Sequence, residues 1–263
     1  MKTENVKYIP QQYLNSLSDK EVSAAEKCFN DLTKQTITAD QFAHMVIASS
    51  VYSSQIEGNS LDINSFFRAK ANTPKNKEVI EVDDLVLAYQ FAENNVLTDV
   101  NLKQAHKILS AYFKNIITNQ KGKYRQTRVG IHSDMGLFYL AIEPEKIEQE
   151  MKKLFADIDK LLSSKISFAE TIYYAAFIHF LFAKIHPFAD GNGRSARLLE
   201  KWFLVQKLGS MAWAIPTEKY YWNNRSLYYN NLNIGVNYYE TIERIANASA
   251  FLQMLPDSFC YTI

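Results

Sequence analysis

The sequence predicts an all-α protein with one small β-hairpin, and three observations carry this prediction. Only eight glycines and six prolines interrupt the 263 residues. Apolar residues make up 47% of the composition and recur at helical spacing along much of the chain. One segment, residues 168–184, is apolar almost all round, as helices at the centre of a domain usually are. Together these features favour a helical protein with a sizeable core.

Residues 1–77 are expected to form an N-terminal helical region. Within it, Asp40 can cap a helix over about residues 41–57, because a short acidic side chain accepts hydrogen bonds from free backbone N–H groups. Gly58 follows as a stop residue. The polar, proline-containing stretch 71–77 then predicts a connection to the next part of the chain.

Residues 78–210 are expected to form a second, mostly helical part. Residues 122–143 differ from the rest, because they hold three glycines among β-favouring residues and predict a short hairpin. The apolar helix 168–184 must end near His186, since Pro187 disfavours α geometry in the residue before it. The remaining predicted helices of this part cover about residues 78–94, 98–113, 144–162 and 194–207.

The rest of the chain, residues 211–263, is expected to add helices that pack on the core. The formal net charge is +1 and no basic tail occurs, so neither nucleic acid nor a membrane surface is an expected partner. Cys28 and Cys260 form no metal-ligand spacing or disulfide framework, which predicts two free thiols in a reducing compartment. Residues 1–5 lack the apolar core of a signal peptide, and no apolar run of about 18 residues suggests a transmembrane helix. A cytoplasmic protein is expected.

Residues 186–197 gather side chains of complementary chemistry. Gly191 and Gly193 allow a tight turn and the close approach of a ligand. The helix that follows would present free N–H groups and the positive end of its dipole to an anion. Arg194 and Arg197 lie three residues apart, so they share one face of this helix. Two cations at the positive end of a helix call for an anion, and a polyphosphate fits.

The same segment supplies a base and a metal ligand. Asp190 offers a hard carboxylate oxygen, which suits Mg²⁺ shared with phosphates. His186, with an ordinary pKa of about 6.5, can be neutral and accept a proton. Asn192 adds a side-chain donor. A base, a metal ligand, a phosphate cradle and a cationic clamp are what phosphoryl or nucleotidyl transfer requires.

This segment closely resembles the signature of the Fic family, His-x-Phe-x-Asp/Glu-Gly-Asn-Gly-Arg-x-x-Arg. The resemblance extends more loosely over residues 81–232. It implies an all-helical core with a hairpin flap, and transfer of AMP from ATP to a Ser, Thr or Tyr hydroxyl of a target protein. Every specified position of the signature is matched, by His186, Phe188, Asp190, Gly191, Asn192, Gly193, Arg194 and Arg197.

The resemblance also implies a role for each site residue. His186 would deprotonate the target hydroxyl, and Asp190 would hold Mg²⁺. Residues 191–193 would cradle the α- and β-phosphates. Arg194 would bind the β-phosphate region and Arg197 the γ-phosphate. A family subtype with Lys in place of the second motif glycine acts as a kinase, so the glycine found here favours AMP transfer.

Two further features resemble parts of the family. Residues 125–142 would be the flap that aligns the target segment by strand pairing, although a plain hairpin stays open. Tyr228 and Tyr229 resemble the family's paired tyrosines near the adenine, and the alternative is that they are core aromatics. The flap residues expected near the active site are Val129, Gly130, Ile131 and His132.

A stretch ahead of the core resembles the family's inhibitory motif, Ser/Thr-x-x-x-Glu-Gly/Asn, on a helix of about residues 41–58. Ser53, Glu57 and Gly58 match it. A carboxylate at the negative end of a helix dipole costs about 0.3–1 kcal/mol unless a cation offsets it. In the family the glutamate pairs with the second motif arginine, here Arg197, where the γ-phosphate must bind. The resemblance therefore predicts an autoinhibited enzyme.

Other functions stay open on the sequence alone. The same site could remove AMP from a modified target, or sense nucleotide without turnover. A DNA-binding regulator is disfavoured, because no basic recognition helix follows the core. The expected partners are ATP, Mg²⁺ and a target protein, with self-modification and a homodimer both open.

Overall fold

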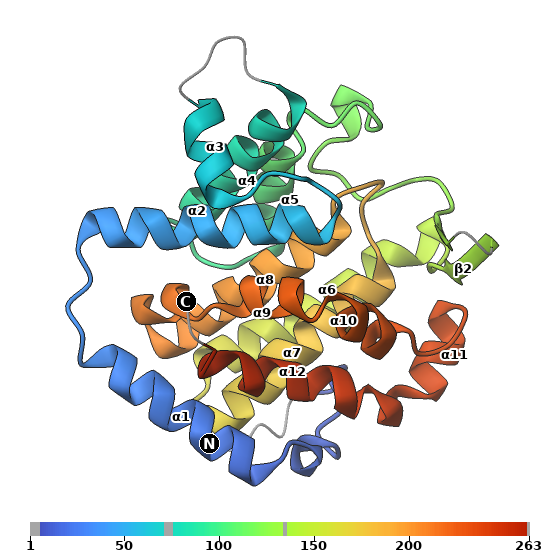
Figure 1. The fold of residues 1–263 in the computed structure, drawn as a ribbon. Helices are drawn as coiled ribbons and strands as arrows, with labels where there is room; N and C mark the ends of the chain where they lie inside the picture. The colour runs from blue at the N-terminus through green and yellow to red at the C-terminus, as the bar shows by residue number, and fades with distance from the viewer. Residues whose placement is uncertain (1–5, 71–75, 134–135, 262–263) are drawn as a thin grey trace.

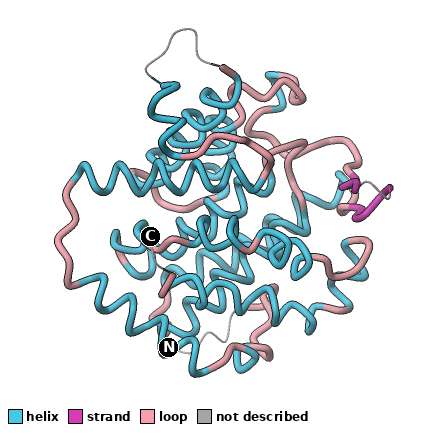
Figure 2. Tube along the Cα trace, in the orientation of Figure 1, coloured by secondary structure: helices cyan, strands magenta, loops and turns pink. Residues whose placement is uncertain are grey.

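The computed structural model describes residues 6–70, 76–133 and 136–261. Figure 1 shows them as helices gathered around the helix α7, and Figure 2 shows the strands of this part confined to one small hairpin at its edge. The predicted all-α fold with a hairpin is confirmed. The helices are α1 (Asp19–Thr33), α2 (Ala39–Ile56), α3 (Ile63–Lys70), α4 (Lys77–Glu93), α5 (Asp99–Leu109), α6 (Pro144–Ser163), α7 (Phe168–Ile185), α8 (Asn192–Leu208), α9 (Thr217–Asn223), α10 (Arg225–Leu232), α11 (Tyr238–Glu243) and α12 (Ser249–Phe259).

Helix α7 is the centre of the fold, as the sequence predicted. Ser167 and Glu170 form a capping box at its start, which satisfies free N–H groups there. By length and composition alone this helix could cross a membrane, which the sequence analysis did not expect. Burial of 78% of this helix inside the structure explains its apolar composition, as in the core helix of a folded domain. Helix α8 packs along α7, so the turn between them lies on a rigid support.

Helix α2 lies across α4 and α9 (Figure 1). Its cap is Thr38, and the prediction of Asp40 is wrong. The Thr38 hydroxyl accepts the N–H of Gln41 at 3.2 Å, and the Gln41 side chain accepts the Thr38 N–H at 2.9 Å. This reciprocal pair satisfies two groups at once, which a single aspartate does not. The helix ends at Ile56, and Gly58 follows with φ 97°, as expected of a stop residue.

Two other helix ends differ from the prediction. Helix α5 ends at Leu109, not near residue 113, and the chain then turns. Helix α8 begins at Asn192, two residues early, because Gly191 takes the left-handed conformation (φ 79°) and turns the chain directly into it. Of the predicted connection 71–77, residues 71–75 lie outside the described part. One apolar core joins the three predicted segments of the chain.

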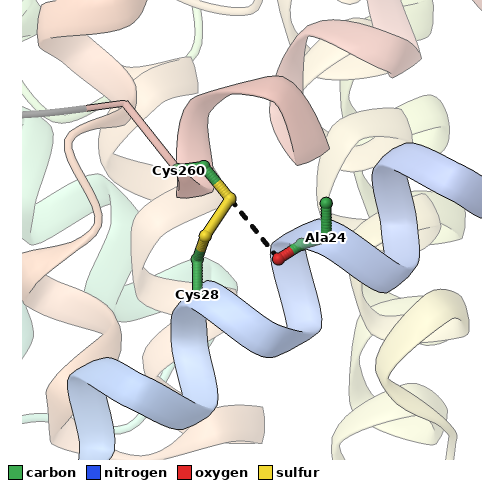
Figure 3. Close-up of a disulfide and its surroundings, with 3 residues drawn as sticks. All are labelled: Ala24, Cys28 and Cys260. Atoms are coloured by element: carbon green, nitrogen blue, oxygen red, sulfur yellow. Dashed lines mark hydrogen bonds between the residues drawn. A yellow bond between two sulfur atoms is a disulfide. The ribbon is translucent and has the colours of Figure 1, made fainter.

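Cys28 and Cys260 form a disulfide, with Cα atoms 5.5 Å apart (Figure 3). The prediction of two free thiols is therefore wrong. Helix α1 packs against α12, which brings together two cysteines 232 residues apart in sequence. The Cys260 sulfur also lies 3.4 Å from the carbonyl oxygen of Ala24 in α1. Because disulfides are rare in reducing compartments, the cysteines no longer support such a location.

Reducing this disulfide is expected to lower the free energy of unfolding by about 2–5 kcal/mol, because the bond closes a very long loop in the unfolded chain. Denaturant unfolding with and without a thiol reductant measures the change. A Cys28→Ser/Cys260→Ser variant is the control, since reductant should not move its unfolding curve. Superimposable curves for the unsubstituted protein would contradict the prediction.

Candidate functional site

The turn between α7 and α8 brings the motif residues together. Helix α7 closes with the His186 N–H bonded to the Phe182 carbonyl at 3.0 Å, and His186 has φ 54°. Among the described residues it is the one non-glycine with positive φ. Such strain persists where the surroundings hold it, and it occurs often at functional sites. The conformation turns the chain sharply at the residue predicted to act as the base.

The Asn192 side chain braces this turn from inside. Its Nδ2 donates to the Phe188 carbonyl, and its Oδ1 accepts the Phe188 N–H, both at 2.8 Å. From the sequence, this amide is predicted to donate to a ligand. Here the side chain is buried and both its oxygen and its nitrogen bond the turn itself. Asn192 therefore fixes the shape of the turn that is predicted to cradle phosphates.

His106 in α5 supports the same turn and was missed by sequence reasoning. Its ring stacks on Phe188 with centroids 3.6 Å apart. Its Nδ1 accepts the N–H of Gly122 at 3.0 Å, so Nε2 carries the proton and donates to the Asp190 carbonyl, also at 3.0 Å. Burial lowers the pKa of His106 to about 4, which keeps this neutral form. The contact joins residues 84 apart, and no local sequence signal marks it.

Arg125 ties the hairpin to the turn. Its backbone N–H bonds the Pro187 carbonyl at 2.8 Å, and its Nε donates to the His186 carbonyl at 2.8 Å. The other guanidinium nitrogens donate to the carbonyls of Thr127 and Ile142, at 2.7 and 2.6 Å. One buried side chain thus bonds the segments on both sides of the hairpin and the backbone of His186, the predicted base.

His186 is arranged to accept a proton. Its Nδ1 lies 3.3 Å from the Ala183 carbonyl, an oxygen that can only accept, so Nδ1 carries the hydrogen. Nε2 is then left with a free lone pair. Burial lowers the pKa of His186 to about 4. The imidazole is therefore neutral near pH 7, as a general base must be.

Arg194 has a geometry suited to binding an anion. Its guanidinium packs over the Phe113 ring at 4.0 Å and lies 3.8 Å from Asp190 and 3.9 Å from Glu81. Its Nε is buried and has no hydrogen-bond partner in the described part of the chain. A buried charged donor without a partner is costly, and a phosphate oxygen would satisfy it.

Asp190 fits Mg²⁺ only together with a phosphate. Its Oδ1 accepts the Gly191 N–H at 2.6 Å, which fixes the carboxylate at the turn. No group of three or more His, Cys, Asp or Glu side chains suited to a metal occurs among the described residues. Mg²⁺ is commonly held by one or two carboxylates, water and substrate phosphates. The donor set therefore fits a metal that arrives with a nucleotide.

Glu57 forms an ion pair with Arg197, which is fully buried. Arg197 Nη2 donates to Glu57 Oε1 at 2.7 Å and to the Ser53 carbonyl at 2.9 Å, and Nε donates to the Ser53 hydroxyl at 2.9 Å. Burial alone would raise the pKa of the Glu57 carboxyl, but Arg197 and Arg194 together hold it below its ordinary value. A Cβ at Gly193 would collide with this carboxylate, so the pair lies against the glycine turn at the start of α8.

The motif lines a cavity of about 290 Å³. Its lining includes Glu57, His186, residues 190–193 and both tyrosines, Tyr228 and Tyr229. Glu57 also lines a polar cavity of about 210 Å³, together with Asp190 and Arg194. A larger, apolar cavity of about 420 Å³ is lined mostly by residues of α2 and of 213–219 and includes no motif residue. Glu57 thus borders both cavities that the motif lines.

The predicted tyrosine pair borders one cavity but makes different hydrogen bonds. Tyr229 is 39% exposed, lines the 290 Å³ cavity and donates to the Ile56 carbonyl at 3.0 Å. Tyr228 lines the same cavity but is 1% exposed, and its hydroxyl contacts Arg197 and His179. The two hydroxyls therefore bond different parts of the protein.

The hairpin consists of β1 (Gly130–Ser133) and β2 (Gly136–Leu140), paired antiparallel. Of the predicted flap residues, Gly130, Ile131 and His132 lie in β1, and Val129 precedes it with its carbonyl bonded to the Ala141 N–H. Ile131 lines the cavity. The end of β2 is bonded to Val236, whereas within the described chain β1 pairs with β2 alone. The outer edge of β1 is suited to accept another strand.

Comparison with known proteins agrees with this geometry. Residues 96–204 match the model of the Fic/DOC family. The chain is 27% identical over 213 residues to a protein adenylyltransferase Fic of Nematostella vectensis, which covers 76% of this chain and 46% of that protein. It is 28% identical over 153 residues to the protein of the same name from Drosophila melanogaster, covering 57% of this chain and 28% of that protein. The chain thus spans less than half the length of these curated relatives.

Solved structures show the same fold. A Fic family protein from Desulfovibrio desulfuricans G20 superposes with a TM-score of 0.72 at 22% identity, over 97% of this chain and 73% of the other. A Fic domain containing signaling protein from Bacteroides thetaiotaomicron superposes with a TM-score of 0.71 at 18% identity, over 91% and 92% of the two chains. At these identities the likeness concerns the fold.

Proposed function

Since this chain carries a Fic domain over residues 96–204, we propose that it transfers the AMP part of ATP to a Ser, Thr or Tyr hydroxyl of a target protein. One observation carries the proposal. A neutral imidazole with a free Nε2 shares one cavity with the glycine-lined start of α8. This arrangement supports a base for a hydroxyl beside a site for phosphates.

In the proposed reaction, Nε2 of His186 takes the proton of the target hydroxyl. The hydroxyl oxygen attacks the α-phosphorus of ATP, the bond from that phosphorus to the bridging oxygen breaks, and pyrophosphate leaves. The backbone N–H groups at the start of α8, with Arg194, would bind the phosphates as charge shifts toward the leaving group. Mg²⁺, held by Asp190 and the phosphates, would supply further charge neutralisation.

We further propose that Glu57 restrains this activity. The carboxylate takes up the guanidinium of Arg197, which the family resemblance assigns to the γ-phosphate. A triphosphate bound in the productive position would have to displace it. The target segment would pair with the free edge of β1, which places its hydroxyl toward the cavity that Ile131 lines.

Labelled ATP tests the proposal. The Glu57→Gly variant is incubated with Mg²⁺, a cell lysate and ATP labelled on either the α- or the γ-phosphate. We expect protein-bound α-label and no γ-label. Label from the γ-position alone would mean a kinase, and no label from either would favour AMP removal or nucleotide sensing without turnover.

The activity in the same reaction is expected to change little as the pH falls through 6.5. Because burial lowers the pKa of His186 to about 4, the base stays neutral as the pH falls through the ordinary histidine range, and activity is lost only near the lowered pKa. Removing Glu57, whose charge favours the imidazolium, moves this pKa in the same direction. Values of kcat/KM between about pH 5.5 and 7.5 measure this. A roughly tenfold fall over that range would indicate an ordinary pKa and contradict the assignment.

A further inference from the structure

Arg197 has one hydrogen bond that goes neither to α2 nor to Glu57, the residue directly after it. Its Nη1 donates to the Tyr228 hydroxyl at 3.2 Å. That hydroxyl lies 2.9 Å from Nε2 of His179, and Nδ1 of His179 lies 2.8 Å from Glu200. Tyr221 also bonds Glu200, at 3.0 Å. All five side chains are buried, so these groups satisfy one another and not solvent.

The proton positions in this network follow from its chemistry. A carboxylate only accepts, so Nδ1 of His179 donates to Glu200. In the tautomer with its hydrogen on Nδ1, the ring accepts at Nε2, and the Tyr228 O–H donates to it. This leaves the lone pairs of the Tyr228 oxygen for the Arg197 N–H. Along the series from Arg197 through Tyr228 and His179 to Glu200, each group donates to the next, so every N–H and O–H in the series has an acceptor.

The partners of Arg197 belong to two different parts of the protein. Ser53 and Glu57 lie on or directly after α2, the helix proposed to restrain activity. Tyr228 lies on α10, and its own partner His179 lies on the central helix α7. The bond between Arg197 and Tyr228 does not involve Glu57, so it can persist when the Glu57 carboxylate moves away. The network therefore holds the guanidinium from the side of the core.

We propose that Tyr228 is a positioning residue that holds Arg197 in place for the terminal phosphate of the nucleotide. This rests on the proposed function, in which Arg197 meets that phosphate. It assigns the two tyrosines different roles: both border the cavity, but the Tyr229 hydroxyl bonds the Ile56 carbonyl, whereas the Tyr228 hydroxyl acts through Arg197. Without the Tyr228 hydroxyl and with Glu57 displaced, Arg197 keeps only its bonds to Ser53 on α2, so its Nη1 must be ordered on binding, which weakens affinity for a ligand that contacts it.

Tyr228→Phe tests this, because it removes the hydroxyl and keeps the ring. Tyr221→Phe is the matched control, since it deletes a buried hydroxyl bonded to the same Glu200 but not to Arg197. Both changes are made in the Glu57→Gly variant, and calorimetry measures the Kd of Mg²⁺ with ATP or ADP. Tyr228→Phe should weaken ATP binding roughly tenfold and ADP binding by less than about twofold. Tyr221→Phe should leave both within about twofold.

Equal losses for ATP and ADP would overturn the proposal in favour of an adenine contact, and equal losses in the two variants would mean a structural role. A second readout needs no nucleotide. The side-chain N–H signals of Arg197 in NMR should show faster rotation about its Nε–Cζ bond with Tyr228→Phe than in Glu57→Gly or the Tyr221→Phe control, because only the Ser53 carbonyl then still bonds an Nη group. Unchanged rotation would overturn the positioning role. Failure of Glu57→Gly to bind ATP would instead overturn the proposed function.

Discussion

Replacing His186 by alanine in the Glu57→Gly variant is expected to lower the rate of AMP transfer by about 10²–10⁴-fold, the usual contribution of a positioned general base. The structure gives the reason. Nδ1 is directed to the Ala183 carbonyl and Nε2 keeps a free lone pair, so deleting the ring removes the proton acceptor of the cavity. The initial rate of α-label incorporation measures the loss.

The control for this substitution is His44→Ala. His44 is an exposed histidine on α2 that stacks on Phe67 and borders the apolar cavity, away from the motif. It should leave the rate unchanged. The Kd for ATP should be unchanged in His186→Ala, because the start of α8 and Arg194 remain. A rate within about twofold of the parent would contradict the role of His186 as the base.

Replacing Glu57 by glycine is expected to raise AMP transfer about 10–100-fold over the unsubstituted protein. A charge-assisted hydrogen bond is worth about 1.5–3 kcal/mol, and this bond must break before a phosphate can take up Arg197. The comparison uses the same α-label assay and the same target lysate. Equal transfer by the two forms would rule out the restraint.

The same substitution should lower stability when no nucleotide is bound. It leaves the fully buried Arg197 without its carboxylate partner, and breaking such a pair by removing one member is costly. Thermal unfolding should therefore occur at a lower temperature, and saturating ATP with Mg²⁺ should recover part of the loss. Glu26 is an exposed glutamate on α1, and Glu26→Gly is the control for introducing glycine. ATP should shift the unfolding temperature of this control by the same amount as that of the unsubstituted protein.

The sequence by itself determined the parts whose chemistry is local. The apolar segment 168–184 could only be stable in a core, and it forms α7. Pro187 and the glycines after it required a turn followed by a helix, and that turn lies between α7 and α8. Base, carboxylate and arginines fell within residues 186–197, so the candidate site could be proposed from one stretch of chain.

Only the tertiary structure decided what holds that stretch in place. Arg125, His106 and the bond from Tyr228 to Arg197 act on it from 31 to 84 residues away in sequence. The disulfide joins helices at opposite ends of the chain. A helix pattern shows which face is apolar, but not which neighbour that face meets. Hydrogen bonds and ion pairs between distant side chains are fixed when the helices pack, because only packing sets the distance between their atoms.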